Sequence, residues 1–314
     1  MQNYNGKNNR KKGVLYRWLG TPNPAKSSGI AFTLACFLPT VLIFVALLFC
    51  GVFGLIVDGY ETQDWFLYLS FILPQLATLI IAFLYFSYTQ TDVKVELKAQ
   101  KCHWKYFLIA FLLQFGLISL SELNNWFLQF LGRFGYESDE ILLPSTQGFG
   151  FVGVFFVLAI FAPVMEELLF RKMILNGVSS VVGTVGTVLV CGALFSLYHQ
   201  NPAQTAYQFC CGAVYTLLAI RSKSVLPTIV AHFLNNALVL ILYVFGISAF
   251  PQSIFIPLMI VSGMCLIGTV AYLIFAEKTE KKQSQKTGQK QFLLYAGAGI
   301  LVCVITWISV LLGI

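Results

Sequence analysis

Long apolar stretches without a charged residue recur along this chain. Residues 30–57, 65–88 and 292–314 contain no Asp, Glu, Lys or Arg. About 20 apolar residues in a helix cross the hydrocarbon core of a bilayer, and backbone polar groups at that depth must be satisfied within the protein. The pattern therefore predicts an all-α protein made of transmembrane helices.

Nine segments fit this pattern, so we predict a polytopic helical bundle of about nine spans. They are residues 30–57, 65–88, 105–123, 148–171, 178–199, 203–220, 225–246, 253–276 and 292–314. The third, fifth and sixth are the least hydrophobic, which is typical of helices that face other helices rather than lipid. Four regions follow from this assignment: a basic tail at 1–29, an eight-span core at 30–276, a polar linker at 277–291 and an additional C-terminal span at 292–314.

The basic residues orient these spans. With a cytoplasmic N-terminus and nine alternating spans, 19 of the 20 Lys and Arg residues fall in inside segments, and only Arg133 falls outside. Cytoplasmic loops are enriched in Lys and Arg, so we expect a bacterial plasma-membrane protein with a cytoplasmic N-terminus and an extracellular C-terminus. The predicted inside segments are 1–29, 89–105, 171–177, 221–224 and 277–291.

The net charge of +7 fits this placement without a nucleic-acid partner. Basic tail residues such as Lys7 and Arg10 would lie against an anionic inner leaflet, and no soluble basic domain is left to bind nucleic acid. The eight cysteines follow no zinc-binding or CxxC spacing, so we interpret them as small apolar packing residues.

Few ionisable side chains lie within the predicted spans, and such residues are functional candidates because burying them in a membrane is costly. In the segment APVMEELLFRK, Glu167 and Arg171 are four residues apart and can pair on one helix face. Glu166 then points about 100° away and can face a cavity. The alternative interpretation is that both carboxylates are interfacial charges at the cytoplasmic end of a helix.

Two further motifs follow on later spans. The segment FSLYH places Phe195 one helical turn before His199, and HFLNN places His232 one turn before Asn236. Each alone also fits a structural role, as a buried histidine or an interhelical hydrogen bond. Together with Glu166, they supply a general base, a second proton carrier and two oxyanion donors, the parts needed for water to attack an amide carbonyl.

The pattern EExxxR, FxxxH and HxxxN resembles the CPBP family of CAAX proteases and bacteriocin-processing enzymes, also called the Abi or type II CAAX prenyl endopeptidase family. The resemblance covers about residues 150–240. It implies that Glu166 and His199 activate water and that His232 and Asn236 stabilise the oxyanion. Glu167, Arg171 and Phe195 would support the site.

The resemblance leaves two mechanisms open, because the family is often described as metalloproteases. Glu166, His199 and His232 could ligate Zn²⁺, although the HExxH motif of common zinc proteases is missing. We favour a mechanism that requires no cofactor, with Zn²⁺ as the alternative.

Two functions follow as expectations. The first is an intramembrane endopeptidase that cleaves membrane-associated or hydrophobic peptides near the cytoplasmic face, for example in bacteriocin or pheromone processing or in self-immunity. The second is a non-catalytic scaffold that regulates a sensor kinase or a cell-wall enzyme, a role that the ninth span would suit.

The depths of the site residues conflict if every span is straight. At about 1.5 Å per residue, Glu166 would lie roughly 8 Å from the cytoplasmic face and His199 more than 20 Å from it. We therefore expect either that the fourth helix continues past Arg171 or that the fifth begins within the membrane.

Overall fold

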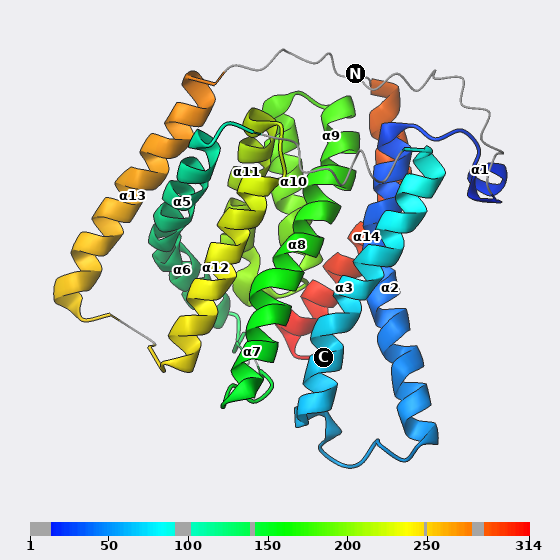
Figure 1. The fold of residues 1–314 in the computed structure, drawn as a ribbon, viewed down its shortest axis with the longest axis horizontal. Coiled ribbons are helices and arrows are strands. Elements are labelled where there is room, and N and C mark those ends of the chain that lie inside the picture. Colours follow the sequence, from blue (N-terminus) through cyan, green and yellow to red (C-terminus); the bar gives the residue numbers. More distant parts are fainter. Residues whose placement is uncertain (1–13, 92–101, 139–141, 248–249, 278–285) are drawn as a thin grey trace.

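The computed structural model describes the chain except for residues 1–13, 92–101, 139–141, 248–249 and 278–285 (Figure 1). The described residues form helices and no strands. The α-helices are α1 (Val14–Leu19), α2 (Pro24–Val52), α3 (Asp64–Thr89), α5 (Lys105–Leu117), α6 (Ser121–Gly132), α7 (Phe149–Phe155), α8 (Ala162–Glu167), α9 (Leu175–Val181), α10 (Thr184–Tyr198), α11 (Thr205–Ser222), α12 (Leu226–Val244), α13 (Gln252–Phe275) and α14 (Lys286–Leu312).

Seven helical segments among the described residues are long and apolar enough to cross a membrane, which makes the chain a multi-pass membrane protein. They are Pro24–Val52, Asp64–Thr89, Lys105–Gly132, Phe149–Val181, Leu226–Val244, Gln252–Phe275 and Gly288–Leu312. They confirm seven of the nine predicted spans. The other two differ from the prediction: α10 is apolar but has 15 residues, about 22 Å of helix, and α11 is not apolar enough to be a candidate span.

The fourth span is longer than predicted. Helices α7, α8 and α9 are joined by π-helical turns at Phe156–Phe161 and Leu168–Ile174 into one segment, Phe149–Val181. The prediction that 171–177 forms a cytoplasmic loop was therefore wrong. The prediction failed because Arg171 is buried against Glu167, so the charge of Arg171 does not mark a helix end. Of the two explanations for the depth conflict, the structure shows the first, in which the fourth helix continues past Arg171.

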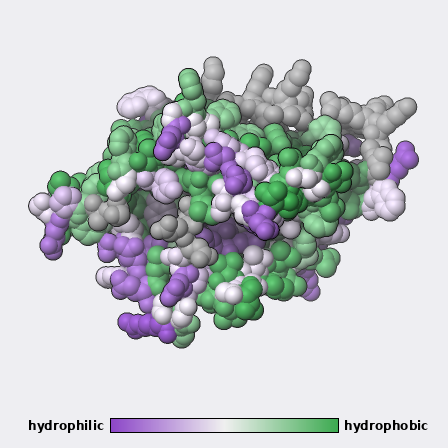
Figure 2. Space-filling view, turned by 90° about the horizontal axis from the view of Figure 1, so that it is seen from below, coloured by the Kyte–Doolittle hydropathy of each residue, from purple (hydrophilic) through white to green (hydrophobic). Residues whose placement is uncertain are grey.

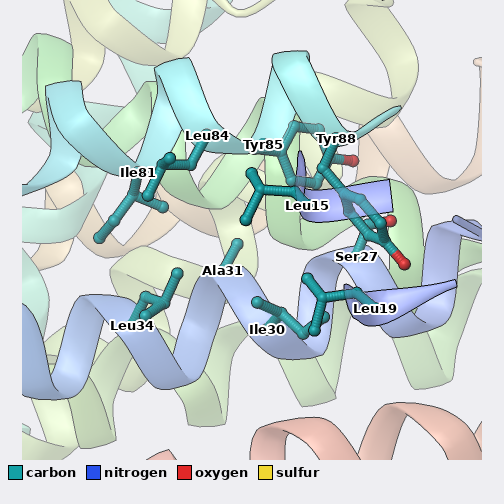
Figure 3. A pocket seen from close by; sticks show the side chains of 10 residues that line it. All are labelled: Leu15, Leu19, Ser27, Ile30, Ala31, Leu34, Ile81, Leu84, Tyr85 and Tyr88. Carbon is teal, nitrogen blue, oxygen red and sulfur yellow. The ribbon is translucent and has the colours of Figure 1, made fainter. Parts of the chain in front are cut away.

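The N-terminal part of the bundle begins earlier than predicted. Helix α2 starts at Pro24, where the side chain of Asn23 accepts a hydrogen bond from the backbone N–H of Lys26 at 2.9 Å, a standard N-cap. Figure 3 shows Leu15 and Leu19 of α1 beside the facing side chains of α2 and α3, around an apolar cavity of about 50 Å³. Of the tail residues assigned to lipid headgroups, Lys7, Arg10, Lys11 and Lys12 lie outside the described residues, and Arg17 lies on α1.

The helices alternate in direction, as Figure 1 shows. The C-terminal ends of α3, α9, α11 and α13 lie at the end of the bundle where α2 begins, and those of α2 and α12 lie at the opposite end. Helices α10 and α11 form a hairpin against each other in the middle of the bundle. Helix α14 packs along α2, so the ninth predicted span is an integral part of the bundle.

Candidate active site

A helical hairpin brings the first two motifs to the same level. Glu166 lies 15 residues before Val181, where α9 ends, and His199 lies 15 residues after Thr184, where α10 begins. At 1.5 Å per residue both are about 22 Å from the turn. The rings of Phe170 and Phe195, each one turn closer to it, meet edge to face with centroids 4.9 Å apart. Arms of equal length therefore place Glu166 opposite His199, near the middle of the long fourth helix.

A proline shapes the helix just before the carboxylates. In the π-helical turn that ends at Phe161, the N–H of Ala162 bonds to the carbonyl of Val157, five residues earlier. The next N–H in that register would bond Leu158, but the residue is Pro163, which has none. Asn236 supplies the donor instead, with its Nδ2 2.8 Å from the Leu158 carbonyl oxygen. Asn236 thus ties α12 to the fourth span.

Glu167 is the centre of a fully buried charged cluster. Its Oε2 lies 3.0 Å from Nε of Arg171, and its Oε1 lies 3.0 Å from Nδ1 of His232. The Arg171 guanidinium lies over the Phe195 ring at 4.8 Å and near the Tyr215 ring at 5.6 Å. A buried charge is tolerated when it is paired and hydrogen-bonded. Glu167 Oε2 and Arg171 Nε form an ion pair without a hydrogen bond, and the hydrogen bonds come from His232 to Glu167 Oε1 and from Nη2 of Arg171 to the Gly212 carbonyl at 3.5 Å. The predicted pairing of Glu167 with Arg171 is confirmed.

Glu166 has a different environment from its neighbour. Its Oε2 lies 3.8 Å from Nε2 of His199 and 3.9 Å from Nε2 of His232. These separations exceed hydrogen-bond length, and within the described part of the chain this buried oxygen has no hydrogen-bond partner. The carboxylate thus points between two imidazoles with its accepting capacity free, at a separation where a water molecule can bridge polar groups.

The contacts of the two Nδ1 atoms determine where the imidazoles of His199 and His232 carry hydrogen. Nδ1 of His199 lies 2.8 Å from the Phe195 carbonyl oxygen, and a carbonyl only accepts, so Nδ1 carries the hydrogen. Nδ1 of His232 faces the carboxylate of Glu167 and donates in the same way. In both neutral rings the Nε2 lone pair is then directed at Glu166. With neutral imidazoles, the two carboxylates and Arg171 sum to −1, so one added proton makes the cluster neutral.

Sequence reasoning missed a polar network next to this cluster. The Asn235 Oδ1 accepts hydrogen bonds from Gln114 at 2.9 Å and from the Tyr207 hydroxyl at 2.6 Å. The Tyr215 hydroxyl donates to Gln114 at 2.7 Å, and its ring lies 5.7 Å from that of His232. The available signals were Gln114 within an apolar span and the second Asn in HFLNN, because buried amides need partners.

A cavity of about 660 Å³ reaches this network from one end of the bundle. Tyr207 and Asn235 form part of its wall, and most of the rest comes from α6, α12 and α13, with Ile247 and Phe250 between the last two. It therefore opens at the end of the bundle away from the start of α2 (Figure 1). Figure 2 views this end and shows hydrophilic side chains gathered within a largely hydrophobic face.

Glu166 lies farther from each of the two imidazoles than two ligands of one Zn²⁺ ion lie from each other. Glu166, His199 and His232 have the right chemistry for Zn²⁺, but tetrahedral zinc with bonds of 2.0–2.1 Å holds its ligand atoms about 3.3 Å apart. The separations here are 3.8 and 3.9 Å. Among the described residues, no group of three or more His, Cys, Asp or Glu side chains is arranged to hold a metal.

The fold and the cluster define a class, a membrane-embedded bundle with a Glu/His site suited to hydrolysis. Residues 148–238 match the family described as Rce1-like, type II CAAX prenyl endopeptidase Rce1-like. The chain thus contains an Rce1-like type II CAAX prenyl endopeptidase (CPBP) family domain, and members of this family are intramembrane peptidases. No curated protein and no solved structure matches the chain significantly.

The predicted site residues lie in one region of the structure. Glu166, Glu167, Arg171, His199 and His232 form one cluster, with Phe195 against both imidazoles at 4.8 and 5.8 Å between ring centroids. Asn236 lies one turn along α12 from His232 and bonds Leu158. The catalytic roles assigned to these residues stay predictions.

Proposed function

We propose that this chain is an intramembrane endopeptidase that hydrolyses peptide bonds of membrane-associated or hydrophobic peptides. The observation that carries this proposal is the Glu166 carboxylate oxygen, which is buried, free of hydrogen bonds from the described residues and directed between Nε2 of His199 and of His232. The adjacent ion pair between Glu167 and Arg171 supports that arrangement. A site of this kind suits proton transfer to and from water.

The geometry supports a sequence of proton transfers. A water molecule between Glu166 and His199 attacks the scissile carbonyl carbon, and its proton passes to Glu166. His232, whose Nε2 then carries the one added proton that makes the cluster neutral, and the second amide hydrogen of Asn236 donate to the oxyanion. When the C–N bond breaks, the proton held by Glu166 goes to the leaving amine. The carboxylic acid and the amine products then dissociate, and the site returns to its starting charge.

In this proposal, the Glu166 proton transfer requires no metal. The support is the charge balance of the cluster, which a single proton brings to zero, together with ligand separations wider than a zinc site needs.

The cavity at the end of α12 suits the substrate chain. Its wall carries uncharged amides such as Asn125 and Gln252, which can bond a peptide backbone, and apolar side chains such as Leu242 and Phe255, which can hold hydrophobic residues. We place the scissile bond near mid-membrane, where Glu166 lies, rather than near one face. The orientation that we propose, a bacterial plasma membrane with the N-terminus inside, follows the positive-inside rule.

The test is hydrolysis in liposomes by the full chain and by Glu166→Gln, using peptides extracted from host membranes and mass spectrometry of new termini. Glu61→Gln, on an exposed turn, is the control for loss of a carboxylate. New termini with wild type and Glu61→Gln, but not with Glu166→Gln, support the proposal. Identical peptide maps from all three folded proteins contradict it and favour the scaffold function.

A further inference from the structure

Helix α14 reaches the segment that follows His199, although it lies outside the residues that match the family. Residues 200–204 connect α10 to α11. Nε1 of Trp307 donates to Oγ1 of Thr205, the first residue of α11, at 2.7 Å. Nε2 of Gln200 lies 3.8 Å from Sγ of Cys303, a weaker contact of the same kind. The last helix of the chain therefore holds both ends of this connection.

Helix α14 is itself fixed firmly to α2. A Cβ at Gly29 would come within 2.9 Å of the Phe292 carbonyl oxygen, and a Cβ at Gly299 within 2.8 Å of Cα of Thr33. This is the close backbone approach that small residues allow between membrane helices. The contacts made by Trp307 and Cys303 thus start from a rigid anchor.

The connection needs such an anchor because its first residue is strained. Gln200 has φ = +52°, in the left-handed region that a side chain with a Cβ adopts at a cost. Strained backbone persists only where surrounding contacts over-determine it. His199 directly precedes this residue as the C-cap of α10, so the conformation of Gln200 sets the direction in which the chain leaves His199. Its ring has one further tether, the bond from Nδ1 to Phe195.

From these contacts we infer that Trp307 and Cys303 are positioning residues for His199. They hold the connection at Thr205 and Gln200, which keeps Nε2 of His199 directed at Oε2 of Glu166. This inference rests on the proposed function for its catalytic consequence, but its structural part stands alone. Helix α14 then helps to position a residue of the site.

The experiment compares full-length wild type, Trp307→Phe and Thr33→Val in liposomes. Trp307→Phe keeps an aromatic side chain and removes the donor, and Thr33→Val keeps the side-chain shape and removes the hydrogen bonds of its Oγ1 with Tyr295 and Gly299. We expect Trp307→Phe to lower kcat by about three- to twentyfold, the range of one interhelical hydrogen bond in a membrane, with KM nearly unchanged. Amide hydrogen exchange within 199–205 should speed up by a similar factor. Thr33→Val should leave both quantities at the wild-type value.

Hydrogen exchange separates this inference from the proposed function, because it needs no substrate. If wild type cleaves no peptide but exchange in 199–205 still rises in Trp307→Phe alone, the peptidase proposal fails and the anchoring stands. Equal exchange in wild type and Trp307→Phe overturns the inference. So does an equal loss of kcat in Thr33→Val, because α14 would then act through general packing. If Trp307→Phe fails to fold, Cys303→Ala, which loses the contacts of Sγ with Gln200 and Cys36, is compared with Cys36→Ala, which loses only the second; exchange in 199–205 that rises equally in both overturns the inference.

Discussion

Adjacent carboxylates on one helix should respond in opposite ways to the same isosteric change. Glu167 is fully buried and paired with Arg171 and His232, whereas the Oε2 of Glu166 has no hydrogen-bond partner in the described structure. Glu167→Gln therefore leaves the Arg171 charge uncompensated in a dry interior. Removing one partner of a buried ion pair costs about 3–5 kcal/mol, so we expect a loss of unfolding free energy of that size.

Glu166→Gln should cost little stability because no direct hydrogen bond to Oε2 is lost. We expect its unfolding free energy to stay within about 1 kcal/mol of wild type, the size of one ordinary hydrogen bond. Its hydrolytic activity should fall by about 10²- to 10⁴-fold, the usual contribution of a general base. Substitution of Glu167 should thus mainly lower stability, whereas substitution of the adjacent Glu166 should mainly lower activity.

The assay is reversible unfolding in mixed detergent micelles, followed by tryptophan fluorescence, with hydrolysis measured on the same preparations. Glu167→Gln combined with Arg171→Met removes both charges and should recover part of the loss, since no uncompensated charge is then left in the interior. The reasoning is refuted if Glu166→Gln destabilises the protein as much as Glu167→Gln does. It is also refuted if the double variant is no more stable than Glu167→Gln.

Three further outcomes are expected. Chelators such as EDTA should leave hydrolysis unchanged, and a loss that added Zn²⁺ restores would contradict the metal-free mechanism. Pro163→Ala restores an N–H beside the Leu158 carbonyl, so Asn236→Ala should cost about 1 kcal/mol less in that background than in wild type, measured by a double-mutant cycle of unfolding. Hydrogen bonding to Lys105 lowers the pKa of the Glu277 carboxyl from its ordinary 4.5. The stabilisation from this contact is therefore present above pH 4.5 and is lost as pH falls through the lowered pKa. The unfolding free energies of wild type and Glu277→Gln should differ at pH 7 and converge in acid.

The sequence predicted the helices well where apolar runs were long and uncharged, and it failed where charge was buried. Arg171 was interpreted as a helix end because basic residues usually mark cytoplasmic loops. That rule assumes a charge seeking water, whereas Glu167 one turn earlier neutralises Arg171 inside the bundle. Periodicity had already indicated the pair, but it could not show that both residues were buried. Burial depends on α11 and α12, which lie later in the chain.

The depth conflict shows a second limit. In the sequence, Gly177, Gly183 and Gly186 each permit a break in the helix, and the structure distinguishes them. At Gly177 a Cβ would lie 2.3 Å from Cβ of Ser28, so this glycine allows a close helix contact. Gly183 is the extended residue before α10 and makes the turn. Once the turn is placed there, the equal distances to Glu166 and His199 follow from counting. The sequence did not show that Gly177 packs against Ser28 and that Gly183 lies in the turn before α10.

The residues matched by the family do not contain everything on which the site depends. Gln114 of α5 completes the amide network beside His232, and the Ser28 hydroxyl of α2 donates to the Met173 carbonyl within the second π-helical turn at 2.5 Å. Trp307 of α14 anchors the connection after His199. A strained and charged site in a membrane must be over-determined by its surroundings. The three motifs therefore specify the chemistry, whereas helices outside the matched region hold the geometry, and substitutions there should alter the rate without touching a motif.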